Sequence, residues 1–247
     1  MEKKLVGFIT SSLPENSFTV DLAFSMKEAG LDTLELGIPF SDPVADGPII
    51  EKASLLALQN NFKLNDLFEV TSKIAPKIDT LWMGYMNPYF HYGIEKFLQK
   101  GLEYNVAGSI IPDLPYEEGK KYKDIFKKYN QSLIDFVAPT DSEQRIKQIT
   151  QNSNKFIYMV AYAGITGSNT NEDLSKIIQN VRENTNTPLY IGFGVDETTA
   201  KEKSKNVDGV IVGSAFVKHL IDDSLNYSEK MRNITQITKN IKDIINS

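Results

Sequence analysis

The chain has 247 residues, of which 41% are hydrophobic and 24% are charged, and its formal net charge is -5. This composition is typical of a globular protein that can bury a large core. The acidic balance disfavours nucleic acid as the main partner, because binding it usually requires a clustered basic surface. The chain has no cysteine and two histidines. We therefore exclude disulfides and thiolate chemistry, and we expect no metal site.

Eight short apolar runs predict β-strands, and helical patterns with apolar residues three and four positions apart separate them. The runs cover residues 5–9, 33–36, 80–83, 107–111, 133–137, 156–160, 189–192 and 209–212. Regular alternation of strand and helix indicates parallel strands. Eight such units in about 250 residues predict a single-domain (β/α)8 TIM barrel over residues 1–247. No apolar run approaches the ~20 residues of a membrane span or forms a signal peptide, so we expect a cytoplasmic protein.

Residues 33–48 hold the first candidates for catalysis. Glu35 lies within an apolar strand that Gly37 and Pro39 end, and a buried carboxylate is costly unless it has a partner or a task. Asp46 follows in the next loop, so both side chains are expected at the carboxyl end of the barrel, where TIM barrels place their active sites. The alternatives are a Glu35 bonded to backbone amides and an Asp46 that caps the following helix.

Two glycine segments after the last two strands indicate an anion site. Gly192, Phe193 and Gly194 follow one strand, and Gly213 and Ser214 follow the next. Glycines let backbone N–H groups approach a phosphate, and a helix beginning at Ser214 would direct its positive end at it. TIM barrels commonly bind phosphate at this place.

The run Glu-Leu-Gly-Ile-Pro-Phe-Ser-Asp-Pro-Val-Ala-Asp-Gly-Pro at residues 35–48 closely resembles the motif of the tryptophan synthase alpha family, and residues 85–88, 111–115 and 158–170 extend the match. The resemblance implies a lyase of tryptophan biosynthesis. This enzyme splits indole-3-glycerol phosphate into indole and glyceraldehyde 3-phosphate by a retro-aldol step. Glu35 would move protons and Asp46 would accept the indole N–H. Family members generally carry an extra helix before the first strand, which we expect to be shortened or absent in this chain.

The resemblance also implies further substrate-binding residues. Phe8 and Tyr158 would line the indole site, with Leu81, Phe193 and Ile211 as neighbours, although each of these suits plain barrel core as well. Gly164, Thr166 and Gly167 would belong to a loop that closes over the substrate and binds phosphate. Two departures concern the phosphate loop and the loop after the first strand: Tyr162 stands where the family commonly has arginine, and residues 11–14 read Ser-Ser-Leu-Pro instead of Ala-Gly-Asp-Pro.

The family pairs this chain with a beta subunit, as an alpha2beta2 assembly. We therefore expect no cofactor in this chain and pyridoxal phosphate in the partner. The loops around residues 85–88 and 111–115, including Asp113, are expected to face that partner.

Two rival functions remain at this point. One is another barrel enzyme acting on phosphorylated sugars or anthranilate derivatives, whose acid–base pairs commonly use a cysteine or a lysine. The other is a barrel that binds a phosphorylated ligand mainly to activate its partner.

Overall fold

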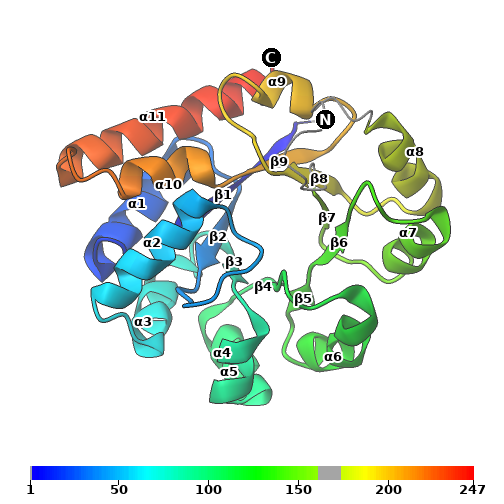
Figure 1. The fold of residues 1–247 in the computed structure, drawn as a ribbon, viewed down its shortest axis with the longest axis horizontal. Helices are drawn as coiled ribbons and strands as arrows, with labels where there is room; N and C mark the ends of the chain where they lie inside the picture. Colours follow the sequence, from blue (N-terminus) through cyan, green and yellow to red (C-terminus); the bar gives the residue numbers. More distant parts are fainter. Residues whose placement is uncertain (1, 161–173) are drawn as a thin grey trace.

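The computed structural model describes residues 2–160 and 174–247. Its strands form one sheet in the order β5-β4-β3-β2-β1-β9-β8-β7-β6, and every neighbouring pair is parallel. Figure 1 shows the strands as a ring surrounded by helices. The strands are β1 (Lys4–Thr10), β2 (Thr33–Gly37), β3 (Asp79–Met83), β4 (Gly108–Ile110), β5 (Ser132–Leu133), β6 (Asp135–Val137), β7 (Ile157–Val160), β8 (Leu189–Gly192) and β9 (Gly209–Val212). The predicted TIM barrel is thus confirmed.

One strand differs from the prediction. The run at residues 133–137 was expected to form one strand, but it forms β5 and β6, which only Ile134 separates. Ser132 and Leu133 pair with β4, whereas Asp135 to Val137 pair with β7. The chain bends at Ile134 because its first half follows one neighbouring strand and its second half follows the other. This single segment joins the two sides of the barrel.

The helices lie outside the ring of strands (Figure 1). They are α1 (Asn16–Glu28), α2 (Pro48–Gln59), α3 (Leu64–Ile74), α4 (Met86–Tyr92), α5 (Ile94–Tyr104), α6 (Tyr116–Lys128), α7 (Glu143–Thr150), α8 (Ser175–Asn184), α9 (Ala200–Lys203), α10 (Ser214–Leu220) and α11 (Tyr227–Ile245). Their apolar faces pack on the outer face of the sheet, as amphipathic helices do in this architecture. A smaller cluster that includes Val6, Leu81, Ile110 and Phe156 fills the barrel interior. None of the described helices is long and apolar enough to cross a membrane.

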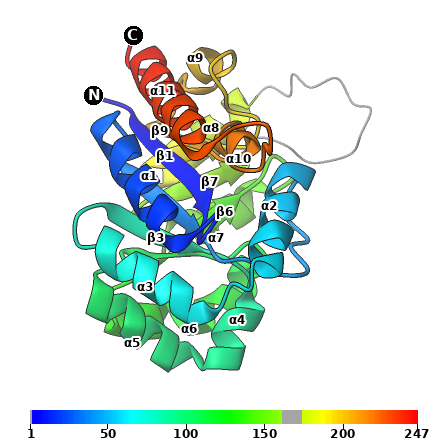
Figure 2. The same cartoon turned by 90° about the vertical axis from the view of Figure 1, so that its left-hand side faces the viewer.

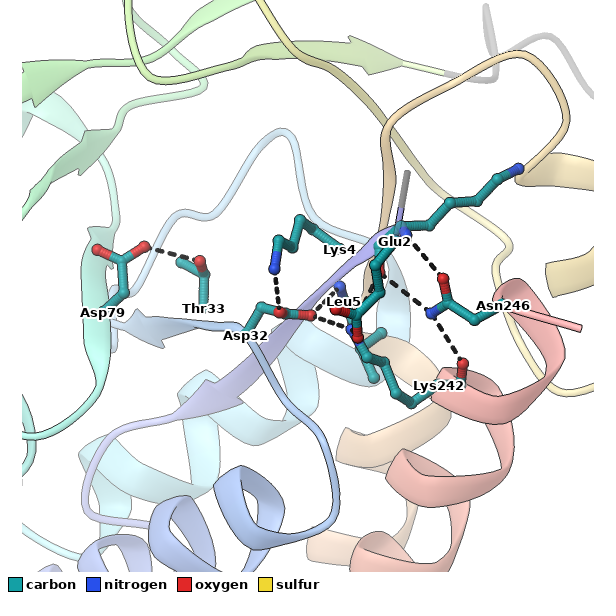
Figure 3. Close-up of polar contacts among 9 residues, drawn as sticks. Glu2, Lys4, Leu5, Asp32, Thr33, Asp79, Lys242 and Asn246 are labelled. Atoms are coloured by element: carbon teal, nitrogen blue, oxygen red, sulfur yellow. Dashed lines mark hydrogen bonds and ion pairs between the residues drawn. The ribbon is translucent and has the colours of Figure 1, made fainter.

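The amino end of the barrel is closed by charged side chains. The two described residues before β1, at positions 2 and 3, form no helix. Instead, Asp32 accepts hydrogen bonds from Lys4 Nζ (2.9 Å), Lys242 Nζ (2.7 Å) and the Leu5 N–H (2.8 Å), as Figure 3 shows. Lys242 therefore ties α11 to the start of β1 and β2. Figure 2 shows the two termini side by side at this end, and α2 at the other.

Candidate active site

A cavity of about 850 Å³ opens at the carboxyl ends of the strands. It is lined by most of the residues that the sequence singles out: Phe8, Glu35, Asp46, Tyr158, Phe193, Gly194, Ile211, Gly213 and Ser214. Gly192 and Leu81 do not line it, and Gly164, Thr166 and Gly167, with Tyr162, lie outside the described residues. The structure therefore brings both predicted carboxylates and both predicted glycine segments to one chamber.

Glu35 stands in the middle of β2, in register with Phe8 of β1 and Leu81 of β3. Its side chain is only 2% exposed, and its Oε1 has no hydrogen-bond partner among the described residues. Burial raises the pKa of Glu35 to about 8, and the nearby negative charge of Asp46 adds to the rise. A carboxyl group in this environment holds its proton at neutral pH, which is the expected direction. The alternative in which backbone amides bind Glu35 finds no support at Oε1.

Asp46 lies in the loop between β2 and α2, where its N–H donates to the Pro43 carbonyl (2.9 Å). Burial raises the pKa of Asp46 to about 6, with the Tyr85 hydroxyl opposing this rise and Glu51 adding to it. The N-cap of α2 is Gly47, so Asp46 does not cap that helix. Asp46 lines the cavity, and its side chain interacts with the Tyr85 hydroxyl.

Tyr85 is a site residue that sequence reasoning missed. The Ala45 N–H donates to its hydroxyl (3.0 Å), and its ring stacks on Phe40 with centroids 5.3 Å apart. Tyr85 follows β3, so it fixes the Asp46 loop to a neighbouring strand. Its place in the run at residues 85–88 was a signal, but nothing in the spacing indicated a contact with Ala45.

Aromatic side chains form the apolar part of the chamber. Tyr158 is 9% exposed, and its ring lies 5.0 Å from that of Phe136. The Phe8 ring fills the space beside Gly37, where a Cβ atom would lie 2.5 Å from it. Leu81, expected as a neighbour of the ligand or as plain barrel core, does not line the cavity and is fully buried in the barrel interior. Flat apolar surfaces of this kind suit an aromatic ligand.

The two glycine segments follow β8 and β9, and in the strand order only β1 separates β9 from β2, which the Asp46 loop follows. Phe193 and Gly194 adopt left-handed backbone conformations, with φ of 75° and 62°. Helix α10 begins at Ser214, as the sequence predicts. Gly192 does not line the cavity, because the Tyr158 side chain covers it: a Cβ atom at position 192 would lie 2.3 Å from the Tyr158 hydroxyl oxygen. We therefore expect Gly192 to act on the ligand through the position of the Tyr158 side chain rather than by direct contact.

Within residues 2–160 and 174–247, no group of three or more His, Asp or Glu side chains could hold a metal ion. Arg145 lines the cavity and forms salt bridges with Asp141 (2.8 Å) and with Glu117.

Comparison with known proteins decides the family. The family model for the tryptophan synthase alpha chain matches residues 1–246. The chain belongs to the tryptophan synthase alpha chain family. The tryptophan synthase alpha chain of Wolinella succinogenes is 55% identical over 246 residues, which cover 99% of this chain and 96% of that one. The alpha chain of a Thermoanaerobacter species is 40% identical, with 98% and 94% of the two chains covered.

Solved structures agree with this assignment. The tryptophan synthase alpha subunit of Campylobacter jejuni superimposes with a TM-score of 0.86 at 32% identity, covering 96% of both chains. A tryptophan synthase structure from Mycobacterium tuberculosis gives 0.87 at 25% identity, covering all of this chain and 94% of that one. Membership of the tryptophan synthase alpha family makes the chain a lyase of tryptophan biosynthesis that acts on indole-3-glycerol phosphate.

Proposed function

We propose that the chamber between Glu35 and Asp46 is where indole-3-glycerol phosphate is cleaved. The observation that carries this proposal is the buried Glu35 at the cavity: its Oε1 has no hydrogen-bond partner among the described residues, and burial raises its pKa to about 8. Cleavage breaks the bond between indole C3 and the glycerol C3' atom. The protonated carboxyl of Glu35 donates a proton to indole C3, and the bond's electron pair returns to the ring. The resulting carboxylate accepts the C3' hydroxyl proton as the aldehyde forms, which restores the acid.

Asp46 acts on the other side of the indole. Positive charge develops on the indole nitrogen when C3 gains its proton, and a carboxylate that accepts the N–H stabilises that charge. For this role Asp46 must be ionised while Glu35 is protonated. The two pKa values are displaced to about 6 and about 8, which permits both states together between those values.

The remaining residues bind the two ends of the substrate. The indole ring lies against Phe8, Tyr158 and Ile211, which line the cavity. The phosphate lies at Phe193, Gly194, Gly213 and Ser214, with Gly192 setting the position of Tyr158 behind them. Gly164, Thr166 and Gly167 complete the phosphate end, by the family resemblance.

A beta subunit that carries pyridoxal phosphate is the proposed partner, in an alpha2beta2 assembly in the cytoplasm, and this chain itself needs no cofactor. The loops after β3 and β4 present the expected contact surface. They are joined by the Asp113 side chain, which accepts the Met86 N–H (2.9 Å). A loop pair held in one shape before binding loses less entropy on association.

The test is indole release from indole-3-glycerol phosphate by the purified chain, with and without a tryptophan synthase beta subunit. Slow release that the beta subunit accelerates is the expected result. No release in either condition would contradict the lyase chemistry. Release that the beta subunit leaves unchanged would contradict the proposed assembly alone.

A further inference from the structure

Helix α9 holds two carbonyl groups of the loop that follows β8. Lys203 Nζ donates to the Phe193 carbonyl (2.6 Å), and Thr199 Oγ1 donates to the Gly194 carbonyl (2.8 Å). The Lys203 nitrogen also lies 3.2 Å from where a Cβ atom would stand at Gly194. These bonds hold Phe193 in a left-handed conformation that residues other than glycine seldom adopt.

Because the peptide unit is planar, these two hydrogen bonds also fix the direction of two N–H groups. In a trans peptide, the C=O of one residue and the N–H of the next point in opposite directions. Because Lys203 holds the Phe193 carbonyl, the Gly194 N–H points away from α9. Because Thr199 holds the Gly194 carbonyl, the Val195 N–H points away from α9 as well. Gly194 and Val195 both line the cavity, and neither N–H has an acceptor among the described residues.

Two lysines near the proposed phosphate end form no salt bridge in the described part of the chain: Lys218 lines the cavity, and Lys203 binds the Phe193 carbonyl. Residues 161–173, which follow β7 in the sequence, contain neither lysine nor arginine. Arg145 is already engaged by two carboxylates. Lys203 is half-buried, and in the described part of the chain it forms no salt bridge of its own. Burial lowers the pKa of Lys203, and the nearby negative charges of Asp196 and Glu202 oppose this fall and favour its charged form.

We infer that Lys203 is a positioning residue for the phosphate of the substrate: it fixes the Phe193–Gly194 peptide with its N–H toward the cavity, and it places a positive charge behind that N–H. This inference rests on the proposed function, in which the phosphate binds at Gly194. A charged donor on the carbonyl also polarises the peptide, which strengthens the N–H on its far side.

The test compares Lys203→Met with Lys201→Met, a matched variant on the same helix whose lysine is exposed. Dissociation constants for inorganic phosphate and for indole are measured by titration calorimetry, alongside kcat and KM for indole-3-glycerol phosphate. Loss of a charge-assisted interaction should weaken phosphate binding about tenfold or more. Indole binding should not change, and KM should rise more than kcat falls. Lys203→Arg, which keeps a charged donor, should recover part of the loss.

The outcomes separate the inference from the function beneath it. A wild-type chain that binds no phosphate would contradict the proposed phosphate end of the site, and the inference with it. A wild-type chain that binds phosphate, together with a Lys203→Met variant that binds it within twofold, would overturn only the inference. Equal losses in Lys203→Met and Lys201→Met would do the same, because they would indicate a general effect of helix charge.

Discussion

The Tyr158 hydroxyl oxygen lies 2.3 Å from the point where a Cβ atom at Gly192 would stand, so β7 and β8 can hold this tyrosine only if residue 192 is glycine. Gly192→Ala must displace the Tyr158 ring, which packs beside Phe136 and lines the cavity with it. We expect a loss of about 1–3 kcal/mol in the free energy of unfolding and a fall in kcat/KM for indole-3-glycerol phosphate. Denaturant unfolding and steady-state kinetics measure both.

Gly119→Ala is the matched control for stability. A Cβ atom at Gly119 would have no neighbour closer than 3.5 Å, and the residue lies within α6. This change should be neutral, or stabilising by up to about 1 kcal/mol. If Gly192→Ala were equally harmless, the position of the Tyr158 side chain would not require a glycine at residue 192.

Glu35 should make stability depend on pH. The pKa of Glu35 rises from 4.5 to about 8 on folding, so between these values the folded state keeps a proton that the unfolded state has released. The free energy of unfolding contributed by this group therefore falls as the pH rises through that window. Gln does not titrate, so Glu35→Gln should gain stability relative to wild type from pH 5 to pH 8. Thermal melts at several pH values measure this gain, and a constant difference would argue against a buried, proton-holding Glu35.

The Tyr85 hydroxyl should lower the pKa of Asp46. Tyr85→Phe removes the acceptor of the Ala45 N–H, at a cost of about 1 kcal/mol, and it removes a group that lowers the pKa of Asp46. The pKa of Asp46 should then rise above about 6. Since activity requires ionised Asp46, the acidic limb of the pH–rate profile should move to higher pH. An unchanged acidic limb would show that Asp46 does not set it.

Much of the fold followed from sequence patterns, because strand and helix periodicities are local. The break at Ile134 could not be predicted in this way. The apolar run continues through Ile134, but the strand that it pairs with changes there, and pairing depends on strands distant in the sequence. In the site, Glu35 and Asp46 were recognisable from a single continuous motif. Tyr85 and Lys203 were not, since their contacts with the Ala45 N–H and the Phe193 carbonyl depend on loop conformations that no residue spacing encodes.

The charged side chains at the amino end of the barrel should contribute to stability without affecting catalysis. Lys242 is bonded to Asp32 and to the Lys3 carbonyl at the end of the barrel away from the cavity. Lys242→Met should lower the free energy of unfolding by roughly 1–2 kcal/mol and leave kcat for indole release unchanged. Lys239→Met, whose lysine is exposed and lies 3.8 Å from Asp243, should change neither quantity. A fall in kcat for Lys242→Met in fully folded protein would contradict the expectation that the amino end of the barrel has no part in catalysis.

Single-turnover indole release by wild type and Glu35→Gln tests the central claim most directly. Gln keeps the shape of Glu35 but can neither donate nor accept the transferred protons. We predict that the variant binds indole-3-glycerol phosphate with wild-type affinity and releases indole about 10²–10⁴-fold more slowly. Wild-type release should itself decline as the pH rises through about 8. A Glu35→Gln variant that binds substrate and releases indole within tenfold of the wild-type rate would contradict the assignment of Glu35 as the proton-transfer group.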